Sequence, residues 1–256
     1  MDVVDQEIHF QEEILMEILG RLPMRSLLQF KCVSKYWKAL TSDPYFTMKH
    51  LNHAKSDRDS KKLIIHQRCP KDGISSMYCC SLSLVQLVEN VQKLDCPSAS
   101  KPRRCAVYCS CSGLVIICVT ENSNDIRSIL MLWNASRRGS VVLPDPQFPL
   151  HGYNLGLGYE STSGDYKILK IRYLVDGRKE PGEIFALRSG SWRNIDKHHT
   201  GSCSQMCGMD STLAFVNNAF HWIGYFEVSR THSLVSFNIS NEVYGEIPLP
   251  EQIPHL

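Results

Sequence analysis

The sequence has no long hydrophobic run, no signal-peptide pattern at its first residues and little excess of charge of either sign. The longest uninterrupted apolar run covers residues 114–119, whereas a membrane-spanning helix needs about 20 such residues. The acidic N-terminus, MDVVDQEIHFQEE, has neither the positive start nor the apolar centre of a secretory signal peptide. A formal net charge of +2 over 256 residues provides no bulk attraction to nucleic acid or to a membrane. We therefore expect a soluble protein of the cytoplasm, the nucleus or both, with no nucleic-acid or membrane partner.

Metal-binding cysteine pairs are also missing. The 11 cysteines include no C-x-x-C pair, the spacing typical of structural zinc sites. The closest spacings are Cys105-x3-Cys109-x-Cys111 and Cys203-x3-Cys207. We favour reduced thiols that pack as small apolar side chains over a zinc site, and we expect no metal or other cofactor.

The common catalytic motifs are absent as well. The sequence contains no P-loop, G-x-S-x-G or H-E-x-x-H. Gly156-x-Gly158 begins like a dinucleotide-binding fingerprint, but the third glycine and the following helical pattern are missing. We interpret these glycines as part of a close-packed strand and expect a protein that is not an enzyme.

The first 50 residues, by contrast, are rich in apolar side chains. Residues 12–19 place them at i, i+1, i+4 and i+5, which predicts an amphipathic helix that ends at Gly20. Pro23 suits the first turn of a second helix. Ser34 is a suitable N-cap for a third helix, and Asp43-Pro44 predicts the start of a fourth.

A module of this size can bury only a small core, and it carries more apolar surface than that core needs. Two interpretations remain open from the residues alone. The helices dock on the rest of the chain as ordinary core, or part of the apolar stripe binds helices of another protein. The polar stretch NHAKSDRDSKK, residues 52–62, predicts a linker after this module.

The run EEILMEILGRLPMRSLLQFKCVSKYWKALTSDPYF resembles the F-box of plant F-box proteins. The family patterns E-I-L-x-E-I-L, R-L-P-x-[KR]-S-L-L-x-F and K-C-V-S-K-x-W match residues 13–19, 21–30 and 31–37. The resemblance implies that the module binds a Skp-family adaptor, which connects it to a cullin and a RING subunit. The chain would then be the substrate receptor of an SCF (Skp–cullin–F-box) ubiquitin ligase.

Carried over by position, the resemblance assigns adaptor contact to ten side chains: Phe10, Ile14, Leu15, Ile18, Leu19, Leu22, Pro23, Leu27, Leu28 and Trp37. Trp37 could instead brace the helices against one another. The family usually opens its F-box with Leu-Pro, where this sequence has Phe10-Gln11. Because glutamine does not restrict the backbone as proline does, we expect adaptor affinity below that typical of the family.

Beyond residue 62 the pattern becomes strand-like, with short apolar runs such as GLVIICVT and SILMLWN between Gly, Pro, Asn, Asp and Ser. A gapless repeat places Trp133, Phe185 and Phe237 in register, 52 residues apart. A strand–turn–strand unit that recurs about every fifty residues is typical of a propeller blade of kelch size. Residues 61–97 predict a degenerate first blade.

The segments LWNASRR, GLGYESTSGDYKILKI and VNNAFHWIG resemble the F-box-associated, kelch-like domain of plant F-box proteins. The expected fold is α+β and multidomain: a helical F-box at 1–51, a linker at 52–62 and an all-β propeller-like domain at 63–256. In that family the β domain continues for several more strands. We therefore expect an incomplete propeller with exposed sheet edges at the C-terminal end.

The resemblance implies that the β domain binds an unidentified target protein, through loops held by a rigid scaffold. Tyr153, Arg178, Lys179 and His198 are candidates for this contact. Two alternatives stay open: a truncated decoy that occupies the adaptor without delivering a substrate, and a glycan-binding β module.

Overall fold

The computed structural model describes residues 11–57, 60–69, 71, 75–82, 91–97, 104–120, 128–137, 139–146, 153–172, 182–195, 203–206, 213–226 and 230–249. The chain divides into two compact units, Met1–Gln67 with Ser76–Asp95, and Arg68–Ser75 with Cys96–Leu256. No described helix is both long and apolar enough to span a membrane.

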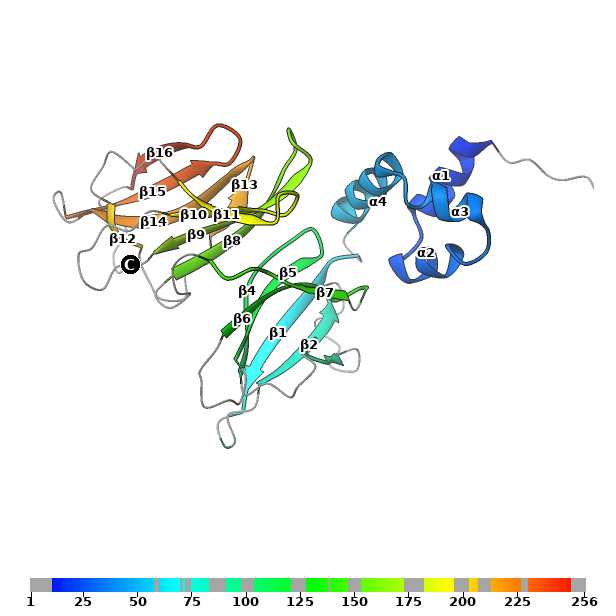
Figure 1. The fold of residues 1–256 in the computed structure, drawn as a ribbon, viewed down its shortest axis with the longest axis horizontal. Helices are drawn as coiled ribbons and strands as arrows, with labels where there is room; N and C mark the ends of the chain where they lie inside the picture. Colours follow the sequence, from blue (N-terminus) through cyan, green and yellow to red (C-terminus); the bar gives the residue numbers. More distant parts are fainter. Residues whose placement is uncertain are drawn as a thin grey trace, which may run out of the picture. The chain divides into compact units, whose positions relative to one another are not determined.

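The first unit begins with four helices, α1 (Glu12–Gly20), α2 (Met24–Phe30), α3 (Lys35–Leu40) and α4 (Pro44–Ser56), shown in blue in Figure 1. Both predicted caps are confirmed. The Ser34 hydroxyl accepts a hydrogen bond from the Trp37 backbone N–H at 3.1 Å. The Asp43 carboxylate accepts bonds from the N–H groups of Tyr45 and Phe46, at 2.8 and 3.2 Å. These bonds satisfy donors that the first turn of a helix cannot pair internally.

Helix α4 is longer than the sequence suggested. Residues 52–56, expected to belong to the linker, form its C-terminal part. Polar composition alone does not end a helix, and this stretch contains no glycine or proline to interrupt the backbone hydrogen bonds.

The helices enclose a core of their own, formed by Leu19, Leu27, Leu40 and Phe46. These four side chains are 1–6% exposed. The Phe30 ring packs on the Trp37 ring beside this core, with centroids 5.1 Å apart. The module therefore has an apolar centre supplied by all four helices.

The degenerate blade predicted at residues 61–97 is a three-stranded sheet, with the order β1 (Lys62–Arg68), β2 (Ser75–Ser81) and β3 (Gln92–Leu94). β2 and β3 pair antiparallel, with Met77 opposite Leu94.

The second unit contains three antiparallel sheets, which we name blades A, B and C. In blades A and B four consecutive strands pair in chain order, and in blade C the strands β12 and β13 both pair with β14 (Figure 1). Blade A has β4 (Arg104–Cys111), β5 (Leu114–Thr120), β6 (Ser128–Asn134) and β7 (Gly139–Val142). Blade B has β8 (Tyr153–Glu160), β9 (Asp165–Arg172), β10 (Glu183–Ala186) and β11 (Ser191–Asn194). Blade C has β12 (Cys203–Met206), β13 (Ala214–Val216), β14 (Ala219–Phe226), β15 (Thr231–Asn238) and β16 (Val243–Pro248).

The strand pairing confirms the 52-residue repeat. In the last hairpin of each blade Met131 lies opposite Val142, Glu183 opposite Asn194, and Val235 opposite Glu246. The repeated aromatic residues Trp133, Phe185 and Phe237 are all buried, at 3%, 2% and 0% exposure. The predicted fold class, a short helical segment followed by a propeller-like β domain, is confirmed.

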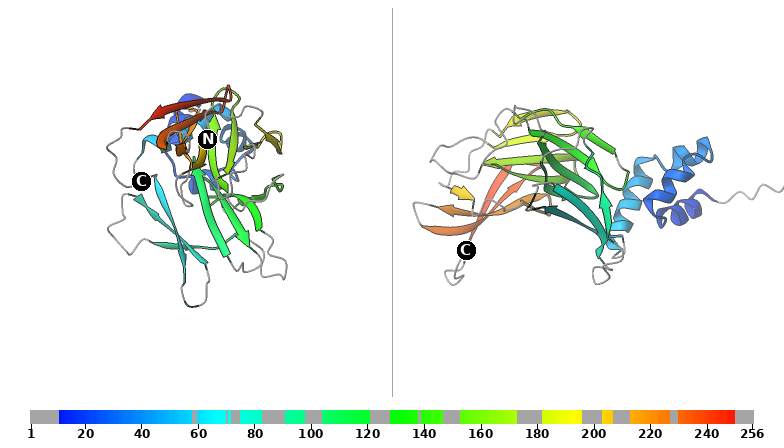
Figure 2. Two further views of the ribbon diagram at one scale, coloured as in Figure 1. Left: turned by 90° about the vertical axis from the view of Figure 1, so that its left-hand side faces the viewer. Right: turned by 90° about the horizontal axis from the view of Figure 1, so that it is seen from below.

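The blades pack face to face, as the fanned sheets in Figure 2 show. Leu143 of blade A packs in a cluster with Leu157 and Phe185 of blade B. Ile195 of blade B packs in a cluster with Trp222 and Phe237 of blade C. Blade B therefore covers an apolar face of blade A, and blade C covers one of blade B.

The innermost strand β8 of blade B lies close against blade C, and two glycines permit this approach. A Cβ atom added to Gly156 would lie 2.7 Å from the Phe220 ring, and one added to Gly158 would lie 2.5 Å from the Phe215 ring. The interpretation of these glycines as part of a close-packed strand is confirmed.

Candidate functional site

Helix α1 keeps two large apolar side chains on the surface. Ile14 is 47% exposed and Ile18 is 52% exposed, whereas Leu19 on the same helix is 2% exposed. Residues four apart lie on the same side of a helix, so Ile14 and Ile18 form one apolar stripe. The core of the four helices is formed by Leu19 and its neighbours, so Ile14 and Ile18 do not contribute to it.

Nine of the ten side chains assigned to adaptor contact are described, and they fall into three groups by burial. Exposed residues are Ile14, Ile18 and Pro23; half-buried residues are Leu15, Leu22, Leu28 and Trp37; buried residues are Leu19 and Leu27; and Phe10 lies outside the described residues. Leu19 and Leu27, at 2% and 3% exposure, hold the helices together. A partner could not reach these two without opening the module, so the surface that we propose below omits them.

Three exposed apolar residues were not singled out by the sequence. Val33, in the turn after α2, is 65% exposed, Tyr36 on α3 is 49% exposed and Tyr45 on α4 is 68% exposed. Tyr36 lies four residues before the buried Leu40, so helical periodicity alone would place it on the buried side of α3. Val33 precedes the N-cap Ser34, and Tyr45 lies in the first turn of α4, where apolar periodicity carries little information.

A shallow hollow of about 460 Å³ lies between α1 and α4. Ile14 and Tyr45 line it together with Glu13, Met16, Glu17 and Lys49. The Glu17 carboxylate accepts bonds from Lys49 Nζ at 2.6 Å and from the Arg21 guanidinium at 3.1 Å. The bond from Lys49, followed by that from Arg21, lowers the pKa of Glu17. The bond to Glu17 raises the pKa of Lys49. Both groups stay charged at neutral pH and link α1 to α4.

The thiol of Cys109 on β4 of blade A is held in its protonated form. Cys105 and Cys118 are buried thiols. Burial, with a smaller effect of Cys111, raises the pKa of Cys109. A thiol that stays protonated is a poor nucleophile and a poor metal ligand. Within the described residues no three His, Cys, Asp or Glu side chains gather as a metal site would require.

Of the four candidates for target contact, Tyr153 alone lies among the described residues. Tyr153 is 5% exposed, and its ring centroid lies 4.1 Å from Lys170 Nζ inside blade B. It is a packing residue in this structure. Arg178, Lys179 and His198 lie outside the described residues.

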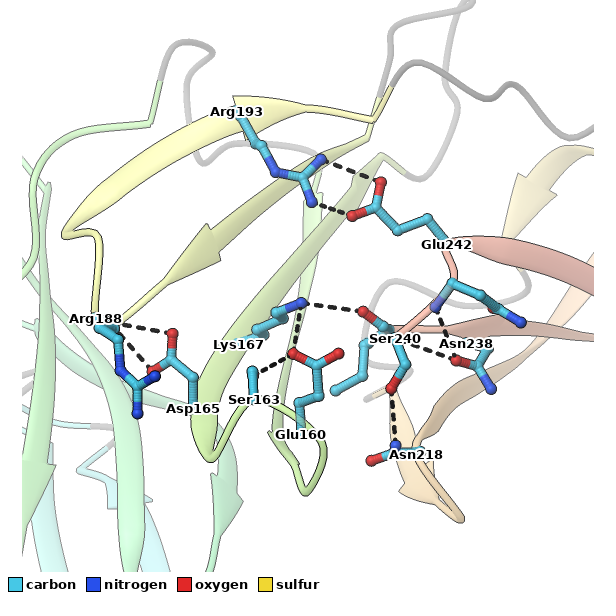
Figure 3. A network of polar contacts seen from close by, with 12 residues as sticks. Glu160, Ser163, Asp165, Lys167, Arg188, Arg193, Asn218, Asn238, Ser240 and Glu242 are labelled. Carbon is cyan, nitrogen blue, oxygen red and sulfur yellow. Dashed lines mark hydrogen bonds and ion pairs between the residues drawn. The ribbon is translucent and has the colours of Figure 1, made fainter.

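A polar network joins the hairpin turns of blades B and C (Figure 3). Lys167 Nζ lies 2.8 Å from the Glu160 carboxylate and donates to the Ile239 carbonyl at 3.1 Å. The side chains of Glu160 and Lys167 are only 6% and 15% exposed. Arg193 of blade B also pairs with Glu242 of blade C. The sequence offered no local signal for the contacts between the two blades, because Lys167 and Ile239, and Arg193 and Glu242, are far apart along the chain.

Replacing Glu160 with glutamine is expected to destabilise the second unit by about 1–3 kcal/mol at pH 7. Burial alone would raise the pKa of Glu160, but bonds from Lys167, Ser163 and Ser240 together lower it. A lowered folded-state pKa means that the carboxylate stabilises the fold above the unfolded pKa and loses this effect as pH falls through the folded pKa. Denaturant unfolding at pH 7 and below pH 4.5 should show the difference between wild type and Glu160→Gln shrinking with acid. A constant difference would contradict this role.

Two protein-family models match the chain. Residues 71–255 match the model described as an F-box associated beta propeller domain, and residues 12–53 match the model described as F-box-like. Two putative F-box proteins of Arabidopsis thaliana are 27% identical over 254 residues and 29% identical over 250 residues. An F-box/kelch-repeat protein of the same plant is 25% identical over 250 residues. The three alignments cover 93%, 92% and 93% of this chain and 60%, 60% and 65% of the relatives. The chain therefore spans about 60% of the length of the first two relatives.

Proposed function

This chain belongs to the family of proteins with an F-box associated beta propeller domain, and from that premise we propose that it is the substrate-recognition subunit of an SCF ubiquitin ligase. In this proposal the helices α1–α4 bind a Skp-family adaptor, which brings a cullin and a RING subunit. The blades bind a target protein, and the chain itself catalyses nothing. It acts by raising the local concentration of the target beside the loaded ubiquitin. We place this activity in the cytoplasm, the nucleus or both.

The observation that carries the proposal is the exposed apolar stripe Ile14–Ile18 on a module whose core is already filled. Together with Val33 and Tyr36, these side chains put large apolar groups on the surface of a segment that matches an F-box-like model. Burial of one such side chain contributes about 1.5–3 kcal/mol. Interfaces with helical partners are built from anchors of this kind.

The variant Ile14→Lys/Ile18→Lys tests the proposal. Lysine is a good helix former and adds no further negative charge beside Glu13 and Glu17, so we expect α1 to remain folded. Losing two apolar contacts and placing two charges against a partner should lower adaptor affinity about 100-fold or more. Binding of the purified full chain to a purified Skp-family adaptor, measured by calorimetry, gives the result.

The matched control is Val141→Lys/Val142→Lys. These valines are 63% and 58% exposed on β7 of blade A, so the control also replaces two exposed branched side chains with lysine. It should bind the adaptor like the wild type. If the folded wild-type chain shows no adaptor binding, or if the Ile14/Ile18 variant binds as tightly as the control, the proposed function is wrong.

A further inference from the structure

Charge is distributed unevenly along the helical module. Residues 11–20 contain three acidic residues and no basic one, whereas residues 21–42 contain five basic residues and no acidic one. The whole chain carries a net charge of only +2. Residues 21–42 are therefore a basic segment of a nearly neutral chain.

Two of the five cations have a side-chain partner, and three have none among the described residues. Arg21 pairs with Glu17 on α1, and Lys31 donates to the Ser42 hydroxyl at 3.0 Å. Arg25, Lys35 and Lys38 are exposed and have no ion-pair or hydrogen-bond partner among the described residues. Lys35 and Lys38 lie three residues apart on α3, where like charges repel one another, so this pair adds nothing to the stability of the helix.

The same segment carries two of the exposed apolar residues, Val33 at 65% and Tyr36 at 49% exposure. We name the set Arg25, Val33, Lys35, Tyr36 and Lys38, on α2, α3 and the turn between them, the basic surface. Tyrosine and arginine are enriched at the centres of protein interfaces. An apolar anchor with cations around it is complementary to an acidic segment that also presents apolar side chains.

We propose that the basic surface docks an acidic segment of the adaptor and thereby sets the rate and the orientation of docking. This inference rests on the proposed function. The acidic start of α1 would repel the same acidic segment, so only one orientation of the adaptor brings opposite charges together. Charges of this kind act mainly on the association rate, because they attract the partner before apolar contacts form.

The test is the association rate of the full chain with a purified Skp-family adaptor at about 50 mM and about 500 mM salt, where the screening length falls several-fold. Lys35→Glu/Lys38→Glu should lower the association rate constant about 10-fold or more at low salt and change the dissociation rate far less. At high salt its association rate should approach that of the wild type.

The matched control is Lys55→Glu/Lys61→Glu, which makes the same change in net charge at exposed lysines outside the basic surface. Its association rate should stay within about twofold of the wild type at both salt concentrations. An equal fall in both double variants, or no fall in either, would overturn the inference and leave the proposed function standing. A wild-type chain that fails to bind the adaptor at any salt concentration overturns both.

Discussion

Replacing Lys170 with methionine is expected to lower the free energy of unfolding of the second unit by about 3–5 kcal/mol. Lys170 on β9 and Glu183 on β10 are cross-strand partners, 0% and 1% exposed, with Nζ and Oε2 2.5 Å apart. Removing the lysine charge leaves the Glu183 carboxylate buried beside an apolar side chain. A loss of that size is a large fraction of the stability of an ordinary domain.

Blades A and C have apolar residues at the positions equivalent to Lys170 and Glu183. The register of the repeat places Ile117 and Met131 of blade A, and Trp222 and Val235 of blade C, at the positions of this ion pair. A buried ion pair replaced as a whole by apolar residues is often neutral or stabilising. The double variant Lys170→Met/Glu183→Met should therefore recover most of the stability that Lys170→Met loses.

The double-mutant cycle consists of the wild type, Lys170→Met, Glu183→Met and the double variant. Urea unfolding of these four proteins at pH 7 gives the coupling free energy between the two residues. Lys170→Met should be much less stable than the double variant. Two results would contradict this explanation: a double variant as unstable as Lys170→Met, or a loss of less than about 1 kcal/mol in Lys170→Met. Either would mean that the buried, unpaired Glu183 carboxylate is not the cause of the lost stability.

Alanine at Ile195 is expected to cost about 2–5 kcal/mol, whereas alanine at Ile247 should cost less than about 0.5 kcal/mol. The two isoleucines occupy the same register position in blades B and C, next to Asn194 and Glu246 of the aligned hairpins. Ile195 is 2% exposed in a cluster with Trp222 and Phe237 of blade C. Ile247 is 63% exposed.

Because the substitution is the same at both positions, the comparison isolates the effect of the covering blade. Leu143 of blade A, 4% exposed under blade B, extends the series and should resemble Ile195 on replacement by alanine. Unfolding in denaturant, with the midpoint and slope both recorded, measures each cost. Similar losses of unfolding free energy at Ile195 and Ile247 would contradict the expectation that blade C stabilises blade B by covering Ile195.

Much of the fold could be predicted from local sequence. Ser34 and Asp43 cap helices where their side chains were expected to, because a cap depends on residues only two or three positions away. The 52-residue repeat predicted three hairpins in a common register, because each hairpin closes within one stretch of chain. The predicted start of the linker at residue 52 was wrong, because α4 continues to Ser56. Composition predicts loops less reliably than periodicity predicts helices.

The candidate site was predicted only in outline. Ile18 and Leu19 both lie in the apolar stripe of α1, yet one is 52% exposed and the other 2%. The stripe is wide, and only the packing of α2, α3 and α4 decides which part of it is covered. Tyr36 was missed for the same reason, because its position relative to the core depends on how α3 docks.

The sequence by itself determined the helices, the strands and the repeat, because turns, caps and alternation act between residues close along the chain. Only the tertiary structure decided which apolar and charged side chains are covered. Ile195 and Ile247 share a register position, and Lys170 shares one with Ile117 and Trp222. Their burial and their partners differ because each blade meets a different neighbour, and burial depends on surfaces that arrive from distant parts of the chain.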